Sequence, residues 1–212
     1  RMLVEIHTER PNARNTDLVM EVQAEQGVGS LMEIQEPARQ RGIRFLQRDE
    51  ALWIYNPRSN TRRPIRLSPR DSFQGTAFAN NDLADSSYAD DYDSEVLRTE
   101  TVEHEDLGQV EAVVIEATAN SDDSAYGRIV MWLRQSDSAP LRMEYYARSG
   151  LLFKRMTLTE FEELAGRQRP SRMRMDSLDQ EGFYSVVHIR ELEAVDDYDD
   201  AMFNQNNLVR GR

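Results

Sequence analysis

The sequence predicts a mainly β protein, in which a meandering antiparallel sheet curls into a barrel or half-barrel. Three observations predict this fold class. Apolar and polar residues alternate in short runs such as Met2-Val4-Ile6 and Leu18-Met20-Val22. Turn-forming groups such as Gly27-Val28-Gly29 and Ser138-Ala139-Pro140 separate the runs at short spacing. Only two short stretches depart from the two-residue period, so strands have to supply the core.

About eleven strands follow from the alternation. In the first quarter of the chain they are separated by the Gly27 turn, by Pro37 and by the charged turn Arg48-Asp49-Glu50. In the second half, Gly127 and Gly150 are among the residues that separate them. The expected strands span residues 2–6, 18–22, 31–34, 43–46, 51–55, 110–118, 129–133, 141–146, 151–158, 172–177 and 184–192.

The two stretches that break the alternation are expected to be short helices. Residues 80–92 begin with Asn residues that suit a helix N-terminus and place Leu83 and Tyr88 on one face. Residues 199–208 resemble a helical turn with Met202 and Phe203 turned inward. No internal repeat or long linker appears, so residues 1–212 are expected to form a single domain.

Composition excludes several classes of protein. The 212 residues contain no cysteine, which removes disulfide frameworks, thiol catalysis and cysteine zinc sites. The longest apolar runs are too short for a transmembrane helix. The formal net charge is −12, which disfavours a general role in nucleic-acid binding.

The charge is distributed unevenly along the chain. Lys154 is the single lysine, so nearly all of the 26 basic residues are arginine. Residues 39–70 hold nine Arg against two acids, a net charge of +7, whereas residues 71–125 hold fifteen acids against Arg98, a net charge of −14. One expectation is that these two blocks pair with each other inside the fold.

No catalytic or metal-binding motif emerges. The three histidines, His7, His104 and His188, stand apart and have no second His at ligand spacing. Nucleophile-elbow, Walker A and dinucleotide-binding glycine motifs are all absent from the sequence. The acidic run at residues 196–200 would suit calcium, but it lacks the EF-hand spacing and is expected to be a solvated run before the last helical turn. We therefore expect a protein that is not an enzyme and that holds no cofactor and no metal.

The methionine and tryptophan residues allow two interpretations. Either they fill an ordinary core, or they line a surface that accepts apolar ligands of varying shape, because thioethers and aromatic rings adapt to such ligands. A curved sheet with little helix to cover it favours a cavity. The residues concerned are Met20, Met32, Met131, Met143, Met173, Met175, Trp53 and Trp132.

A series of short motifs resembles the outer membrane lipoprotein-sorting protein family, which is related to the periplasmic lipoprotein carrier LolA and its outer-membrane receptor LolB. Their order and spacing cover nearly the whole chain. The motifs are Trp53-Ile54-Tyr55-Asn56-Pro57, Thr61-Arg62-Arg63-Pro64-Ile65, Asp71-Ser72-Phe73-Gln74-Gly75-Thr76-Ala77-Phe78, Asn81-Asp82-Leu83, Val114-Ile115-Glu116-Ala117, Pro140-Leu141, Glu144-Tyr145-Tyr146, Gly150-Leu151-Leu152, Pro170-Ser171-Arg172-Met173 and Phe203-Asn204-Gln205-Asn206-Asn207-Leu208.

The resemblance implies an incomplete antiparallel barrel whose open side is covered by helices, a location in the periplasm of a Gram-negative bacterium, and a concave face that holds acyl chains. Two departures stand out. The family segment after Phe73 usually reads Gly-Ser-Asp-Phe, and here Ala77 replaces the Asp. The family also has an N-terminal helix before its first strand, and this sequence is expected to lack it.

In this interpretation the segment 73–88 is a lid, although its aromatic residues would equally serve to anchor a helix to the sheet. Arg62, Arg63 and Arg66 either meet a lipid phosphate or an anionic membrane surface, or form internal salt bridges with residues 82–95. The residues expected to line the cavity and its lid are Trp53, Tyr55, Phe73, Phe78, Leu83, Tyr88, Met131, Trp132, Met143, Met173 and Met175.

The expected function is a periplasmic carrier that shelters the acyl chains of a lipid or lipoprotein on the way to the outer membrane. An RND-type exporter in the inner membrane or an outer-membrane acceptor is the expected protein partner, with peripheral membrane contact and a monomeric state. The alternative is a sensor or adaptor that uses the same half-barrel to bind a membrane protein.

Overall fold

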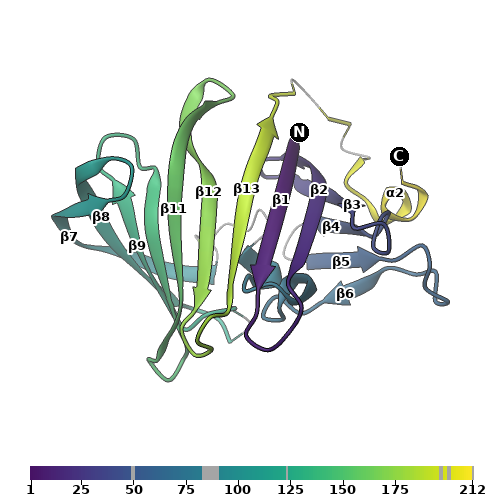
Figure 1. The fold of residues 1–212 in the computed structure, drawn as a ribbon, viewed down its shortest axis with the longest axis horizontal. Coiled ribbons are helices and arrows are strands. Elements are labelled where there is room, and N and C mark those ends of the chain that lie inside the picture. The colour runs from purple at the N-terminus through teal and green to yellow at the C-terminus, as the bar shows by residue number, and fades with distance from the viewer. Residues whose placement is uncertain (49–50, 83–90, 123, 196–197, 200–201, 212) are drawn as a thin grey trace.

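The computed structural model describes residues 1–48, 51–82, 91–122, 124–195, 198–199 and 202–211. These residues form one 13-stranded antiparallel sheet with the order β6-β5-β4-β3-β2-β1-β13-β12-β11-β10-β9-β8-β7. The sheet is strongly curved but does not close, so β6 and β7 are its two free edges (Figure 1). The mainly β, half-open architecture predicted from the sequence is confirmed.

The chain runs through two meanders that meet at a seam. The strands of the first are β1 (Met2–Glu9), β2 (Thr16–Glu25), β3 (Gly29–Glu36), β4 (Arg44–Arg48), β5 (Ala51–Tyr55) and β6 (Ile65–Leu67). Those of the second are β7 (Tyr92–His104), β8 (Gly108–Ala119), β9 (Arg128–Arg134), β10 (Pro140–Tyr146), β11 (Leu152–Leu164), β12 (Arg167–Ser177) and β13 (Tyr184–Leu192). At the seam β1 pairs with β13, with Met2 opposite Leu192 and Glu9 opposite Tyr184.

Two of the thirteen strands were not among the eleven predicted. β6 has only three residues, too few for alternation to be visible. β7 is long, but residues 93–99 are all exposed and most of its side chains are polar or charged. An edge strand with both faces open to water has no apolar face, so the two-residue pattern that identifies the other strands is missing from it.

The main core lies on the inner, concave face of the sheet. It collects the inward-facing side chains of strands from both meanders, such as Ile6, Met20 and Phe45 from the first and Tyr145 and Met175 from the second. Each of these is at most 2% exposed. Burial on this scale stabilises by about 25 cal/mol per Å² of apolar surface.

A short segment between β6 and β7 fills part of the concave face, and we call residues 72–82 the plug. It contains the 3-10 turns η1 (Phe73–Gly75) and η2 (Asn80–Asp82), and in Figure 1 it lies behind the lower part of β1. Phe73 and Phe78 are at most 1% exposed and belong to the inner core. The helix expected over residues 80–92 is described at its two ends, where residues 80–82 form a 3-10 turn and Tyr92 begins β7. Residues 83–90 lie outside the described part of the chain.

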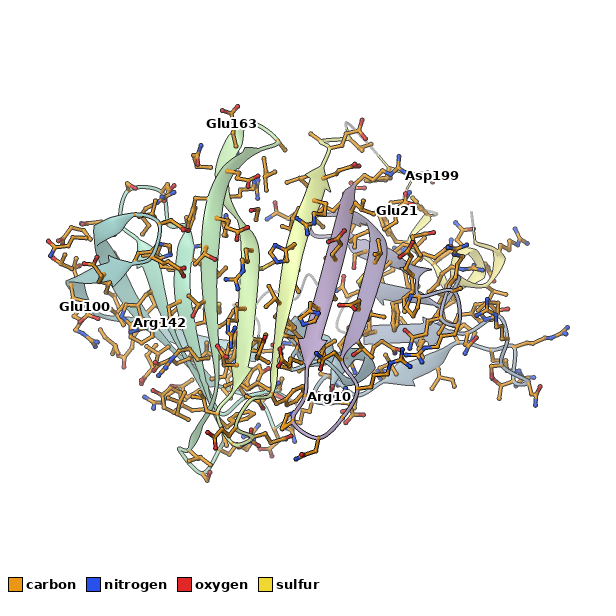
Figure 2. The ribbon with its side chains drawn as sticks, viewed as in Figure 1. Arg10, Glu21, Glu100, Arg142, Glu163 and Asp199 are labelled. Atoms are coloured by element: carbon orange, nitrogen blue, oxygen red, sulfur yellow. The ribbon has the colours of Figure 1, made fainter. Side chains whose placement is uncertain are left out.

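The outer face carries two smaller apolar clusters. Near β7–β10 the cluster around Trp132 is closed by polar groups: the Trp132 indole N–H donates to Glu100 at 2.7 Å, and the Arg142 guanidinium lies 3.8 Å from the ring centroid. Glu100 and Arg142 are neighbours at this end of the sheet (Figure 2). The stacked Arg142 side chain thus covers part of this outer apolar cluster.

At the other end, helix α2 (Gln205–Arg210) packs on the outer face of β3–β5 and buries Phe203 and Leu208 there. Asn204 caps its start by accepting from the Asn207 N–H, and Gly211 ends it in the left-handed conformation. The guanidinium groups of Arg44 and Arg48 donate to the carbonyls of Leu208 and Phe203 at 2.7 and 2.8 Å. The helical turn expected near residues 199–208 is therefore a helix a few residues further on, with Phe203 buried as expected.

The two oppositely charged segments lie on opposite halves of the sheet. The basic residues 39–70 include β4–β6, whereas the acidic residues 71–125 include β7 and β8 at the other edge. Among the described residues, no ion pair joins an Arg of the first segment to an acid of the second. Arg70 does reach across, but to the backbone carbonyls of Asp122 and Ser124. The expectation that the blocks pair is not met in the described part of the chain.

We expect Leu208→Ala to lower the free energy of unfolding by about 2–5 kcal/mol, because it leaves a cavity under α2 where the side chain is fully buried. Urea-induced unfolding measures the loss. Val209→Ala on the same helix is the control: Val209 is 36% exposed, so its effect should stay within about 0.5 kcal/mol. Equal effects of the two variants would contradict the docking of α2 through Leu208.

Candidate ligand-binding cavity

An open cavity of about 990 Å³ lies on the concave face, at the end of the sheet away from the plug. Its walls come from both meanders, with β1 and β2 on one side and β11–β13 on the other. Such a volume is at the upper end of the range of about 300–1,000 Å³ that is usual for small-molecule sites.

The floor of the cavity is apolar. Met2 and Leu192 contribute from the two sides of the seam, and Leu158, Met173 and Ile189 contribute from β11, β12 and β13. Leu158 belongs to the inner core, and Met2 and Met173 pack against it, so the floor is a continuation of that core. An apolar ligand lying here would bury its surface against hydrocarbon and thioether groups.

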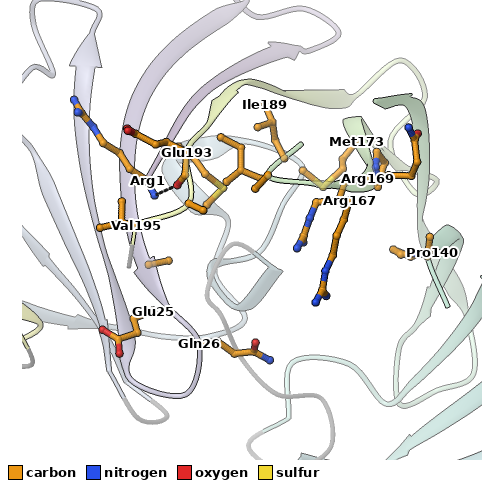
Figure 3. A pocket seen from close by; sticks show the side chains of 18 of the residues that line it. Arg1, Glu25, Gln26, Pro140, Arg167, Arg169, Met173, Ile189, Glu193 and Val195 are labelled. Carbon is orange, nitrogen blue, oxygen red and sulfur yellow. Dashed lines mark hydrogen bonds between the residues drawn. The ribbon is translucent and has the colours of Figure 1, made fainter. Parts of the chain in front are cut away.

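The rim is polar and is built from turns. It includes Glu25 at the end of β2, Gln26 from the β2–β3 turn, Asp137 from the β9–β10 turn, and the segment 193–195 after β13. Arg167 and Arg169, from the start of β12, extend their side chains into the cavity, as Figure 3 shows. The Glu193 N–H donates to the Arg1 carbonyl at 2.9 Å, which ties the last part of the rim to β1.

The structure places one group of the expected site residues on the concave face. Met173 lines the cavity. Met143 and Met175 are buried in the inner core and Met131 packs against it, while Phe73 and Phe78 belong to the plug. These residues are brought together around one core, next to the cavity.

A second group lies elsewhere. Trp53 and Tyr55 belong to the cluster under α2, and Trp132 belongs to the cluster near β7–β10, both on the outer face. The reason is the strand period of two: Leu52 and Ile54 take the inner face of β5, so Trp53 and Tyr55 take the outer one. Leu83 and Tyr88 lie outside the described residues.

Arg62, Arg63 and Arg66 lie at the β6 edge and are all exposed. Among the described residues they form no ion pair, so the salt bridges expected with residues 82–95 are not found within residues 82 and 91–95. They are remote in the sheet order from β11–β13, which carry the cavity.

Several lining residues were not singled out from the sequence, namely Met2, Leu158, Ile189, Arg167 and Arg169. The first three lie in strands that were predicted, and their alternation put each on one face. That pattern does not say which face is concave or which end of it stays uncovered. Arg167 and Arg169 precede the strand predicted at 172–177, whose true start is Arg167.

Hydrogen bonds and buried side chains fix the plug to the sheet. The Ala77 N–H donates to the Ser185 hydroxyl at 2.9 Å, and that hydroxyl also lies 2.8 Å from the Thr8 hydroxyl, across the seam. Ala77 is 2% exposed. A carboxylate at this position would be buried, which costs free energy unless the carboxylate is hydrogen-bonded, and alanine avoids that cost.

A polar cluster anchors the far end of the plug. The Tyr126 hydroxyl donates to the two carboxylate oxygens of Asp82 at 2.8 and 2.7 Å, and the Ala79 N–H donates to the same carboxylate at 2.7 Å. The ammonium group of Lys154, the only lysine, lies 3.5 Å from the Tyr126 oxygen. Burial raises the pKa of Asp82 and lowers the pKa of Lys154, and each charge opposes the shift of the other.

Tyr126→Phe should lower the free energy of unfolding by about 1–3 kcal/mol, because it leaves the Asp82 carboxylate without its side-chain donor. Urea-induced unfolding at neutral pH measures this. Tyr55→Phe is the matched control, since within the described residues the Tyr55 hydroxyl has no hydrogen-bond partner, and its effect should be below about 0.5 kcal/mol. A loss at Tyr126 no larger than at Tyr55 would contradict the anchoring role.

Asp82→Asn should remove a pH dependence of stability. Because the folded state raises the pKa of Asp82 above 3.8, its stabilising contribution is complete below that pH and is lost as pH rises through the raised value. The free energy of unfolding of the unmodified protein minus that of Asp82→Asn should therefore fall with rising pH, measured in urea from about pH 3 to pH 7. A difference that is flat or rises with pH would refute this assignment.

The described residues contain no group of three or more His, Asp or Glu side chains placed to hold a metal ion. His104 is buried and its Nε2 lies 2.8 Å from the Leu158 carbonyl, while His7 lies 2.6 Å from Asp17. His188 Nδ1 lies 3.7 Å from a Glu160 carboxylate oxygen, so each of the three histidines has a local polar partner. No helix in the described part of the chain is long and apolar enough to cross a bilayer.

Comparison with known proteins agrees with this architecture. A LolA superfamily protein from Nitrosomonas europaea has a similar structure, with a TM-score of 0.82 and 28% identity over 97% of this chain and 89% of its own. A domain from Vibrio parahaemolyticus, named for outer membrane lipoprotein sorting, has a TM-score of 0.84 and 22% identity over 99% of this chain and 90% of its own.

A DUF1329 family protein from Desulfovibrio piger is also similar, with a TM-score of 0.79 and 21% identity over 97% of this chain and 90% of its own. No curated protein matches the sequence. A family model described as uncharacterized protein-like matches residues 27–210. Because that model spans most of the chain, the protein belongs to this family, and its fold is similar to that of the LolA superfamily protein and of the lipoprotein-sorting domain.

Proposed function

We propose that the protein is a non-enzymatic periplasmic carrier that shelters acyl chains of a lipid or lipoprotein during transport toward the outer membrane. The observation that carries this proposal is the open cavity of about 990 Å³ with an apolar floor. A polar rim around an apolar floor suits a ligand that has a hydrocarbon part and a polar end. The likeness to the LolA superfamily protein and to the lipoprotein-sorting domain supports the same reading.

The energetics of the cavity match such a cargo. Burying one methylene stabilises by about 0.8 kcal/mol, so an acyl chain of roughly 15 carbons gains on the order of 10 kcal/mol before the costs of ordering it. The rim leaves the entrance open to water at the end away from the plug. Cargo therefore enters and leaves between the turns of the rim, while the plug stays in place as the closed end.

The resemblance to the lipoprotein-sorting family suggests the partners that we propose. An RND-type exporter in the inner membrane hands over the cargo, and an outer-membrane acceptor with a more favourable cavity takes it. The exposed Arg62, Arg63 and Arg66 at the β6 edge supply a positively charged surface for contact with anionic headgroups of a membrane.

Saturable binding of a fluorescent fatty acid tests the carrier function, and Met173→Asp should weaken that binding at least tenfold because it places a charge on the apolar floor. Leu178→Asp is the matched control, since Leu178 is 43% exposed in the β12–β13 turn and does not line the cavity. Ile189→Gln, a milder change of the floor, guards against loss of folding, which circular dichroism monitors.

Mass spectrometry of an organic extract of gently purified protein gives an independent readout. Lipid present in stoichiometric amount supports the carrier. An empty cavity combined with stable binding to the periplasmic part of a membrane protein would instead support a sensor or adaptor. Absence of fatty-acid binding at any concentration below micelle formation would overturn the carrier proposal.

A further inference from the structure

The entrance of the cavity carries two arginine side chains whose charge is not used by the fold. Arg167 and Arg169 line the cavity, and both point into it in Figure 3. Among the described residues neither guanidinium has an ion-pair partner. Glu162 lies opposite Arg169 in the register of β11 and β12, but the two side chains form no ion pair.

The other charged groups of the entrance either have an ion-pair partner or lie on the opposite side of the cavity. Asp137 is paired with Arg134 at 2.5 Å, and the Arg1 guanidinium is paired with Glu21 at 2.7 Å. Glu25 and Glu193 come from the side of the cavity formed by β2 and the segment after β13, away from β12 (Figure 3). The Arg1 α-ammonium donates to the Glu193 carbonyl at 2.9 Å. Among the described residues that line the cavity, the guanidinium groups without an ion-pair partner are therefore those on β12.

A tight hairpin holds the two arginines in place. The β11–β12 turn has Ala165 and Gly166 with φ of 51° and 73°, both left-handed, as a two-residue turn that matches strand twist requires. Leu164 pairs with Arg167 and Glu162 with Arg169 directly after the turn. The arginines thus sit on paired backbone above Met173, which lies further along the same strand.

This order of groups along β12 fits one class of ligand. We propose that the cavity takes amphiphiles with an anionic headgroup, a carboxylate or phosphate held by Arg167 and Arg169, whose acyl chain lies on the floor formed by Met2, Leu158, Met173 and Ile189. Guanidinium groups bind carboxylate and phosphate through paired hydrogen bonds. The inference rests on the proposed carrier function and adds the headgroup to it.

The test compares three soluble probes, dodecyl phosphate, dodecanol and inorganic phosphate, by their ability to displace a fluorescent fatty acid and by calorimetry. Dodecyl phosphate should bind more tightly than dodecanol, and added salt should weaken the former more than the latter, because exposed charges are screened. Inorganic phosphate should not show saturable binding in the same range. Equal binding of phosphate with and without the chain would overturn the proposal.

Arg167→Gln/Arg169→Gln should weaken dodecyl phosphate binding by about tenfold, as expected for loss of two partly exposed charge-assisted contacts, and leave dodecanol binding within about twofold. The matched control is Arg14→Gln/Arg39→Gln, which removes two exposed charges that do not line the cavity and should change neither.

The outcomes separate this inference from the carrier proposal. If none of the chain-bearing probes binds, the carrier function itself fails. If dodecanol and dodecyl phosphate bind equally and the Arg167/Arg169 variant binds both as before, the carrier stands and the headgroup assignment is wrong. The assignment is also wrong if the Arg14/Arg39 variant, and not the Arg167/Arg169 variant, loses binding of dodecyl phosphate.

Discussion

The architecture depends on burying one concave apolar face with very little chain to cover it. The inner side of the sheet is apolar across strands of both meanders, and within the described residues the plug, residues 72–82, is the main segment packed into it. The plug fills one end, with Phe73 and Phe78 fully buried, and the other end is left as an open apolar surface. A fold with a larger helical layer would have a solid core in place of a cavity.

The polar contacts of the plug explain why it stays in place when the rest of the face is open. Aromatic burial gives it affinity for the sheet, but apolar contact alone does not specify one position. The Ser185 hydroxyl and the Asp82–Tyr126 pair supply that specificity, at the cost of placing ionisable groups where burial disfavours their charged forms. The defined position of the plug, and with it the closed end of the cavity, thus depends on these polar contacts.

Most of the fold could be predicted from the alternation of apolar and polar residues, because a strand with one buried face has an apolar residue at every second position. β7 could not be predicted in this way, since an edge strand that is exposed on both faces shows no such alternation. The residues of the candidate site were harder to predict from the sequence than the strands. The period of two separates Trp53 from Leu52, yet it does not tell which face curves inward. Both tryptophans were expected on the ligand side, but Trp132 is buried beneath a stacked arginine and Trp53 is half-buried in the cluster under α2, both on the outer side. Curvature is a property of the whole sheet, and no local pattern reports it.

The seam between β1 and β13 has a consequence for how the cavity comes into existence. Every other strand pairing joins neighbours in the chain, so each meander can assemble from hairpins, whereas this one joins residues almost the full length of the chain apart. Met2 and Ala24 line the cavity from one meander, and Leu158 and Met173 line it from the other. Without the β1–β13 pairing, each meander is a separate twisted sheet with one apolar face. The cavity therefore exists only where this long-range pairing is made, because local turns alone do not bring its two walls together.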